Sequence, residues 1–378
     1  MESRADFVQC LGSDMSINIL ACLNEPVDVV RAGSVSRLWH HFVITNGISK
    51  KLCLKRFPQL SGIARITEPD WITTEANGAG SNNSSWDILK RDHNVYASLL
   101  HAITTLNTCQ CECIAYAVSA SSTDRFPAES VANTLTTRRY LGGHSYWSSK
   151  GHADPDSPET LIYKLKADLC VISEISVQPF EAFYQPGQPI YSAKSVRFRL
   201  GHPKNSLDEN DVLQMPQQQA ADDKFIWTYT SEVYPMEQKN CLQQYKLPEP
   251  VLCIGGYLQI ELLGRVQRQH SDNLFYTCVS HVKVMGGGPL CPAFDIDILE
   301  PSGKFALKYT PGVLRWMLPS FSENSNMSPM PAEEEAVENV GVMGFLLQAY
   351  HGGIEPMVWD EPMEWDDNDE EMDELGVL

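Results

Sequence analysis

The chain has 378 residues, of which 43% are hydrophobic and 20% charged, and its formal net charge is −19. The charge is uneven: residues 316–378 hold 16 of the 48 acidic residues and no Lys or Arg, whereas the first 315 residues carry 29 basic and 32 acidic side chains. Because nucleic acids and anionic membranes are bound through clustered Lys and Arg, both are excluded as the main partner.

The sequence also indicates a compartment. It has no run of 18 apolar residues, and its first residues lack the basic-then-apolar pattern of a signal peptide. We therefore expect a protein of the cytoplasm, the nucleus or both. Its eleven cysteines are then expected to be reduced thiols and not a disulfide framework.

Residues 1–60 are predicted to form a small domain of short helices. Ser13 is a suitable N-cap for a helix that ends near Pro26, and a second helix fails near Gly33. A third begins at Ser34 and carries an apolar stripe formed by Val35, Leu38, Trp39 and Phe42. So small a bundle has little interior, so part of this apolar surface is expected to contact a partner.

Three further segments precede the carboxyl end. Residues 61–85 contain a polar stretch rich in Gly, Asn and Ser, and are predicted to be a linker. Residues 86–111 are predicted to be a bracing helix, in which Trp86, His93 and Leu100 keep helical spacing. Residues 112–300 alternate between apolar and polar side chains, as at Val196, Phe198 and Leu200. Such alternation, broken by turns rich in Pro and Gly, predicts an antiparallel β-sandwich of the jelly-roll kind.

Residues 301–378 are predicted to be an acidic, largely disordered tail. Beyond Pro319, Ser, Asn, Pro and Glu predominate, and such a segment buries too little apolar surface to offset its ordering entropy. A short apolar stretch at 340–350 and several aromatic residues among the acids leave open an interaction segment as well as a solubilising tail. The fold class is thus multidomain α + β.

The first 43 residues resemble an F-box of the plant type. Residues fall at the family's spacings without a gap: Leu11, Asp14, Ile19, Leu20, Leu23, Val27-Asp28-Val29, Val35 and Trp39. One departure is Gly12, because the family usually has Pro there, which makes the entry to the helix more rigid.

This resemblance implies binding to a Skp-family adaptor and, through it, to a cullin complex that acts as a ubiquitin ligase. Such binding requires an apolar helical face with Leu and Trp anchors. The expected adaptor-binding residues are Leu11, Ile19, Leu20, Leu23, Val29, Val35 and Trp39. The alternative left open by periodicity alone is that the same residues form a self-contained helical core.

The start of the predicted sandwich is similar to a galactose-binding-like (discoidin-type) domain. The similarity lies in residues 119–151, with a Ser-rich start, Pro127-Ala128-Glu129 and Tyr146-Trp147-Ser148-Ser149, and in residues 257–264. The loop between 137 and 160 is then the candidate ligand site, since it combines aromatic faces with hydrogen-bond donors. Its candidate residues are Arg138, Arg139, Tyr140, His144, Tyr146, Trp147 and His152. For Trp147 a place in the core is the stronger interpretation.

Metal, cofactor and catalytic sites are not indicated. Cys109, Cys111 and Cys113 form a C-x-C-x-C run, but a zinc site needs a fourth ligand and usually a wider spacing, so packing thiols are the default. The sequence contains no nucleophile elbow, phosphate-binding loop or zinc-protease motif. We therefore expect a non-catalytic protein without a cofactor.

Together these features predict a substrate-receptor subunit of a Skp-cullin-F-box ubiquitin ligase. The sandwich would hold an unknown target protein, with a glycosylated target as one option. The main alternative is an intracellular carbohydrate-recognition module with no ligase role. A transcriptional co-regulator acting through the acidic tail is a third, less favoured because no DNA-reading element is visible.

Overall fold

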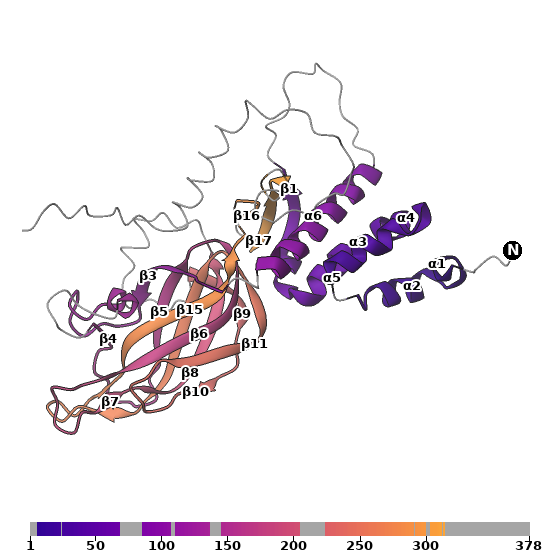
Figure 1. Cartoon of the computed structure of the whole chain (residues 1–378). Coiled ribbons are helices and arrows are strands. Elements are labelled where there is room, and N and C mark those ends of the chain that lie inside the picture. Colours follow the sequence, from indigo (N-terminus) through magenta and orange to yellow (C-terminus); the bar gives the residue numbers. More distant parts are fainter. Residues whose placement is uncertain are drawn as a thin grey trace, which may run out of the picture. The chain divides into compact units, whose positions relative to one another are not determined.

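The computed structural model describes residues 6–23, 25–68, 85–106, 110–136, 145–204, 224–290, 292–299, 303–311 and 313 (Figure 1). Helices come first in the chain and strands follow. The acidic segment after residue 313 lies outside the described residues, as do residues 69–84 of the predicted linker.

The amino-terminal part consists of short helices. They are α1 (Phe7–Cys10), α2 (Ser13–Leu20), α3 (Pro26–Ser34), α4 (Arg37–Thr45) and α5 (Ile48–Arg56), followed by the 3₁₀ helix η1 (Pro58–Gly62) and the longer α6 (Ser85–Leu106). Pro26 occupies the first turn of α3, where its missing N–H costs nothing. Ser36 caps α4, since its hydroxyl accepts a hydrogen bond from the Trp39 N–H at 3.3 Å.

The short helices share one hydrophobic core with α6. Leu20 of α2, Val29 of α3 and Leu52 of α5 are buried in the same cluster as Leu99 and Ile103 of α6. The predicted bracing helix is therefore confirmed as a helix over Ser85–Leu106, and it supplies one wall of this core. Residues 1–60 are not a self-contained core, because α6 covers much of their apolar surface.

Packing of α5 against α6 makes the helical core sensitive to pH. The ring Nδ1 of His93 on α6 lies 3.1 Å from the Ser49 hydroxyl on α5. Burial lowers the pKa of His93, with a smaller effect from nearby His40. As pH falls below about 6.5, the unfolded chain takes up this proton before the folded chain does, so stability present above that pH is lost below it.

We expect the free energy of unfolding to be smaller at pH 5 than at pH 7.5, and His93→Gln to reduce that difference. Urea titrations followed by circular dichroism at both pH values measure it. His270→Gln is the control, because His270 is exposed and should leave the pH dependence unchanged. An identical pH dependence in His93→Gln and the parent chain would contradict the prediction.

A three-stranded sheet packs against the helices. Its strands show that two of the predicted domain boundaries need correction. Strand β1 (Ile63–Thr67) runs parallel to β17 (Lys304–Tyr309), which pairs antiparallel with β16 (Phe294–Leu299). The predicted linker 61–85 thus begins with a strand, and the predicted tail 301–378 contains one. Phe294 and Phe305 are buried in the helical core cluster, which explains why these strands leave the sandwich.

The predicted antiparallel β-sandwich is confirmed by two sheets. One sheet has the order β10-β8-β12-β5-β3, with β9 paired to β8, and the other has the order β11-β6-β15-β2, with β4 and β7 at its margins. The first sheet comprises β3 (Ile114–Ala120), β5 (Glu159–Leu165), β8 (Ala193–Pro203), β9 (Phe225–Thr230), β10 (Tyr234–Pro235) and β12 (Tyr257–Arg265). The second comprises β2 (Cys111–Glu112), β4 (Trp147–Ser148), β6 (Leu169–Glu181), β7 (Ile190–Tyr191), β11 (Gln243–Ile254) and β15 (Cys278–Pro289).

The inward face of each sheet follows the predicted alternation. Val196, Phe198 and Leu200 of β8 meet Val282 and Val284 of β15 in one buried cluster. On β12 the expectation of a wet outer face is wrong, because Gln259 and Glu261 are also buried. The Glu261 carboxylate is paired with Arg197 and Arg199 on the neighbouring strand β8, so burial of this charge is compensated.

Two neighbouring strands, β6 and β11, link the sandwich to the helical core. Leu169 and Val171, at the start of β6, belong to the same cluster as the α6 residues, together with Leu252 and Ile254 at the end of β11. The rest of β6 continues into the sandwich core through Ile175 and Val177.

Among the described residues, none of the helices is long and apolar enough to cross a membrane.

Candidate functional site

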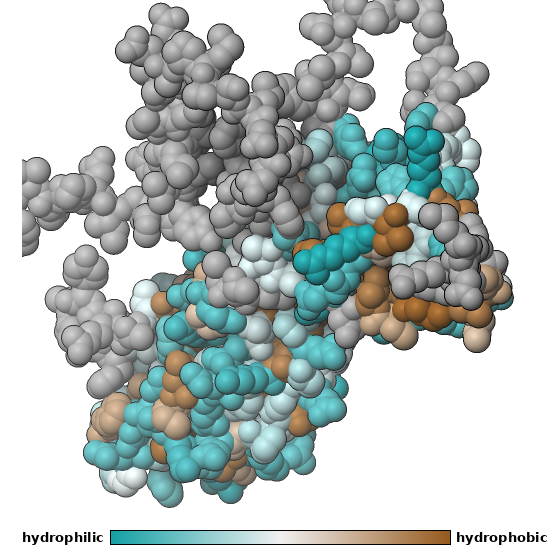
Figure 2. Space-filling view, turned by 45° about the vertical axis from the view of Figure 1, so that its right-hand side comes forward, coloured by the Kyte–Doolittle hydropathy of each residue, from teal (hydrophilic) through white to brown (hydrophobic). Residues whose placement is uncertain are grey.

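Six large apolar side chains are exposed on and beside helices α2 to α4. We call this set the apolar face, and it consists of Leu11, Met15, Ile19, Val30, Val35 and Leu38. Figure 2 shows hydrophobic surface gathered over the helical part of the molecule. Met15 and Ile19 are one turn apart on the same side of α2, which places them together. A grouped set of exposed apolar side chains, unlike scattered single ones, is typical of a binding surface.

The seven predicted adaptor-binding residues differ in their exposure to solvent. Leu11, Ile19 and Val35 are exposed and belong to the apolar face. Leu23 and Trp39 are half-buried and pack against the helical core, and the Trp39 indole N–H donates to the Asp6 carboxylate at 2.7 Å.

Leu20 and Val29 are buried, at 3% and 1% exposure, so for them a surface role is corrected to a core role. Adjacent residues of a helix point about 100° apart, so Leu20 can face the core while Ile19 faces solvent. The predicted core interpretation therefore holds for Leu20 and Val29, and the binding interpretation remains for the exposed residues.

Three residues of the apolar face were missed in the prediction. Met15, Val30 and Leu38 are exposed, with Met15 at 59%. Met15 stands four residues before Ile19 and Leu38 three residues after Val35, so helical spacing could have identified both. For Val30, sequence offers no signal, because its neighbour Val29 is equally apolar and only packing shows which one is buried.

Gly12 lies at the start of α2 in a conformation that proline also adopts. Its φ is −58° and its ψ is 153°, and no atom lies within 4 Å of a Cβ built there. We expect Gly12→Pro to raise the free energy of unfolding by about 0.4–1 kcal/mol, because proline restricts the unfolded chain at no steric cost in the folded one. Urea unfolding measures the change. A destabilised Gly12→Pro chain would contradict this expectation.

The predicted ligand loop is only partly accounted for. Arg138, Arg139, Tyr140 and His144 lie outside the described residues. Trp147 is completely buried, and its indole N–H donates to the Ser122 carbonyl at 3.0 Å, as the core interpretation predicts. His152 is exposed, and its Nδ1 accepts a hydrogen bond from the Asp154 N–H at 3.0 Å, so it shapes a turn.

Tyr146 packs beside a hollow that its neighbour Ser145 lines. Its ring stacks on Phe180 of β6 with centroids 3.9 Å apart, and its hydroxyl donates to Glu129 Oε1 at 2.8 Å. Burial raises the pKa of Tyr146, so the phenol stays neutral. Next to it Ser145, Phe180, Glu181 and other residues line a hollow of about 180 Å³. Sequence could not have found this hollow, since its walls come from segments more than a hundred residues apart.

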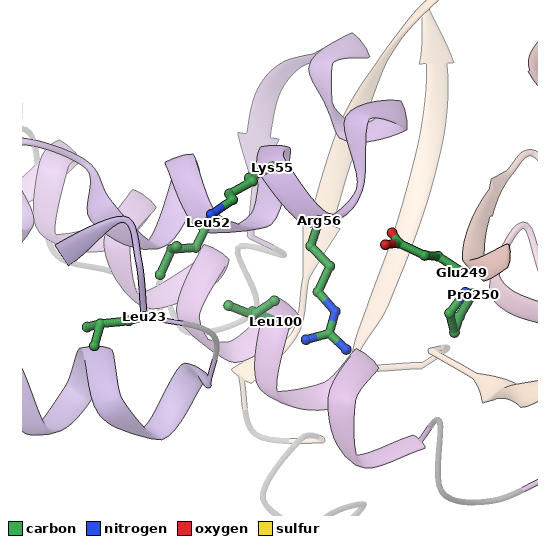
Figure 3. Close-up of a pocket in the computed structure, with 7 residues that line it drawn as sticks. All are labelled: Leu23, Leu52, Lys55, Arg56, Leu100, Glu249 and Pro250. Carbon is green, nitrogen blue, oxygen red and sulfur yellow. The ribbon is translucent and has the colours of Figure 1, made fainter. Parts of the chain in front are cut away.

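A second, larger hollow of about 370 Å³ lies where helices meet β11 (Figure 3). Leu23, Leu52 and Leu100 give it an apolar part, and the charged residues Lys55, Arg56 and Glu249 also line it, with the Glu249 carboxylate directed toward the side where Arg56 lies. The register of β11 with β6 shifts between Lys246 and Val251, so Glu249 is released from the ladder to reach this place. The hollow is thus an incompletely filled junction between the helical core and the sandwich.

Four cysteines of the sandwich, Cys111, Cys113, Cys170 and Cys253, lie close to one another. Within the described part of the chain, no three His, Cys, Asp or Glu residues are grouped as metal ligands. Cys109 lies outside that part. A hydrogen bond from Cys113 lowers the pKa of the Cys111 thiol. Cys170 and Cys253 are paired across β6 and β11 in the sandwich core and are free thiols.

Comparison with known proteins finds a relative that is similar over most of the chain. No family model matches the chain. The Arabidopsis thaliana protein named F-box protein At4g00755 is 43% identical over 338 residues, which cover 87% of this chain and 86% of that protein.

This chain belongs to the F-box protein family.

The similarity of this F-box protein to its relative covers most of both chains and so extends well beyond the helices. Solved structures similar to it include the family 32 carbohydrate-binding module of Clostridium perfringens NanJ in complex with galactose, with a TM-score of 0.28 and 10% identity over 49% of this chain and 96% of that one. The family 32 module of Streptococcus pneumoniae EndoD has a TM-score of 0.30 and 8% identity over 46% and 97%. The order of the strands in this F-box protein, and not these matches, establishes its sandwich.

Proposed function

We propose that this F-box protein is the substrate-receptor subunit of a Skp-cullin-F-box ubiquitin ligase. The observation that carries the proposal is the apolar face, which the helices leave uncovered although α6 fills their other side. Membership of the F-box family supports a Skp-family adaptor as the protein that covers it. Half-buried Leu23 and Trp39 would then lie at the edge of the contact.

The proposed mechanism is proximity and not chemistry on this chain. The adaptor links the helices to a cullin, and the sandwich holds a target protein. Shared burial of Leu169 and Val171 with α6 supports a fixed spacing between the two, since these side chains belong to β6 and to the helical core at once. Holding a target beside a charged ubiquitin carrier raises its effective concentration, and acyl transfer occurs on other subunits. In this proposal the protein is a non-catalytic subunit.

Reconstitution with purified components tests the proposal. The full-length chain is co-expressed with a plant Skp-family adaptor, purified, and mixed with a cullin–RING complex. We expect an adaptor complex that elutes as one species and joins the cullin. The full chain is needed because α6 completes the helical core. A cooperatively folded chain that binds none of the adaptors at micromolar concentration would refute the proposal. Glycan binding by such a chain would instead support a carbohydrate-recognition module.

A further inference from the structure

The hollow beside Tyr146 has the size of a single side chain. It is lined by Gln178, Phe180 and Glu181 at the end of β6, by Phe183 in the next turn, by Asn240 between β10 and β11, and by His281 on β15. Its volume of about 180 Å³ is below the roughly 300 Å³ at which pockets for drug-sized ligands begin. It therefore suits one protruding group and not an extended ligand.

Hydrogen bonds within the wall use one of the two N–H donors of each side-chain amide, Asn240 and Gln178. The Asn240 amide donates to Glu181 Oε2 at 2.8 Å, and the Gln178 amide donates to Asn240 Oδ1 at 2.8 Å. His281 Nδ1 lies 3.0 Å from the Thr134 carbonyl, so it carries the proton and donates. The remaining hydrogen-bonding capacity includes Glu181 Oε1, the Gln178 side-chain oxygen and His281 Nε2, which in the neutral ring accepts.

The two hydroxyl groups of the lining also donate their hydrogens within the protein. Ser145 Oγ donates to the Asn133 carbonyl at 2.8 Å, and Ser280 Oγ donates to the Gln178 carbonyl at 3.1 Å. Each hydroxyl then offers only lone pairs to a ligand. The carboxylate and hydroxyl oxygens and the neutral ring nitrogen of the lining fit a group that is rich in donors.

The charge and the aromatic rings of the lining further limit the kind of chemical group that the hollow could bind. Among the described residues of the lining, Glu181 is the one with a formal charge. The nearby Lys239 is paired with Glu237 at 2.6 Å. Phe183 and Tyr184 are 42% and 66% exposed at the rim, although apolar rings usually avoid water. A carboxylate that shares a lining with an exposed aromatic ring, as Glu181 does with Phe183, attracts a cation through both its charge and the ring quadrupole.

We propose that this hollow binds the guanidinium group of an arginine side chain in the target protein. Guanidinium has five donors and no acceptor, is always charged, and stacks on aromatic rings. The inference rests on the proposed function, because it names what the sandwich recognises. Eleven residues of β6 separate Leu169 in the helical core from Phe180 at the hollow, so the strand places the arginine site about 35 Å from that core.

Short peptides test the inference with the full-length chain. The probe is an acetylated and amidated Gly-Gly-Arg-Gly-Gly peptide, titrated by ligand-observed NMR, which detects millimolar affinities. A citrulline peptide of the same shape but without charge, a lysine peptide and galactose are compared with it. We expect the arginine peptide to bind at least tenfold more tightly than the citrulline peptide.

Variants locate the binding. Glu181→Gln keeps an acceptor for Asn240 but removes the charge, and should weaken arginine binding about tenfold. Phe183→Leu removes the ring at an exposed position and should weaken it severalfold. Glu232→Gln is the matched control at an exposed carboxylate outside the lining, and should change nothing. Thermal melts establish that all three variants fold.

Equal binding of the arginine and citrulline peptides would overturn the inference, as would arginine binding that Glu181→Gln and Phe183→Leu leave intact. Preference for galactose over the arginine peptide would identify the hollow as a sugar site, which also overturns it. Adaptor binding by the unmodified chain is measured separately. If the adaptor binds but arginine does not, only the arginine site is lost. If arginine binds but the adaptor does not, the ligase role is lost and the site stands.

Discussion

Ile19→Asp is expected to weaken binding of the Skp-family adaptor about 100-fold without unfolding the protein. Ile19 is 45% exposed in the apolar face, so an aspartate there stays hydrated in the free chain. In the complex the same carboxylate would be buried without a partner, which costs far more than the lost apolar contact. Isothermal titration of the adaptor into the full-length chain measures the affinity, and urea unfolding measures stability.

Ile88→Asp is the matched control for this variant. Ile88 lies on α6 outside the apolar face and is 42% exposed, so the same change of chemistry occurs at nearly the same exposure. We expect its adaptor affinity to stay within twofold of the parent chain. Equal losses in both variants would mean that general surface charge, and not the apolar face, controls binding. A normal affinity of Ile19→Asp would remove α2 from the interface.

Buried Leu20 illustrates why exposure must guide the choice of variant. It is 3% exposed and packs in the helical core, so Leu20→Asp would bury a charge in the free protein and unfold the helices. Loss of adaptor binding in that variant would therefore carry no information on the interface.

Glu159→Gln is expected to lower the free energy of unfolding by about 3–5 kcal/mol. The carboxylate is paired with Arg265, and the two side chains are 5% and 3% exposed. Arg265 also donates to the carbonyls of Lys150 and Phe275 and to the Ser149 hydroxyl, at 2.7 to 3.1 Å. The change keeps the shape of the side chain but leaves the guanidinium charge without compensation inside the sandwich. Urea unfolding measures the loss.

Two further variants serve as controls for the effect of Glu159→Gln on stability. Asp156→Asn breaks the exposed ion pair with Lys194 and should cost at most about 1 kcal/mol, since solvent screens that pair. The double variant Glu159→Leu with Arg265→Met removes both buried charges and should be more stable than Glu159→Gln. If Glu159→Gln and Asp156→Asn cost the same, Arg265 does not depend on this partner.

The position of this ion pair also explains a motif of the sequence. Ser148 and Ser149 follow Trp147, and Ser149 Oγ accepts from Arg265 while the Thr277 N–H donates to it at 3.0 Å. Trp147 fills the core beneath them. The Tyr-Trp-Ser-Ser segment, which suggested a ligand loop, therefore owes most of its pattern to packing, and Tyr146 stacks on Phe180 beside a hollow.

The sequence by itself determined the features that depend on local spacing. Helical and alternating periods predicted the short helices, the helix at Ser85–Leu106 and the sandwich, because side-chain direction repeats within a few residues of any helix or strand. The order of Leu11, Ile19, Val35 and Trp39 indicated the family before any contact was known. Splitting the charge identified a near-neutral body and an acidic carboxyl end.

Only the tertiary structure decided which apolar residues are covered and which distant segments meet. Leu20 and Ile19 are chemically alike, and only α6 makes one core and the other surface. Strand β1 pairs with β17 more than 230 residues later in the chain. Local sequence patterns do not show such a pairing, so they predict a linker and a tail for these two segments. The arginine-sized hollow joins Ser145, Asn240 and His281 for the same reason. The local period of apolar residues determines on which side of a helix or strand each side chain lies. Whether that side is buried depends on which other segment of the chain packs against it.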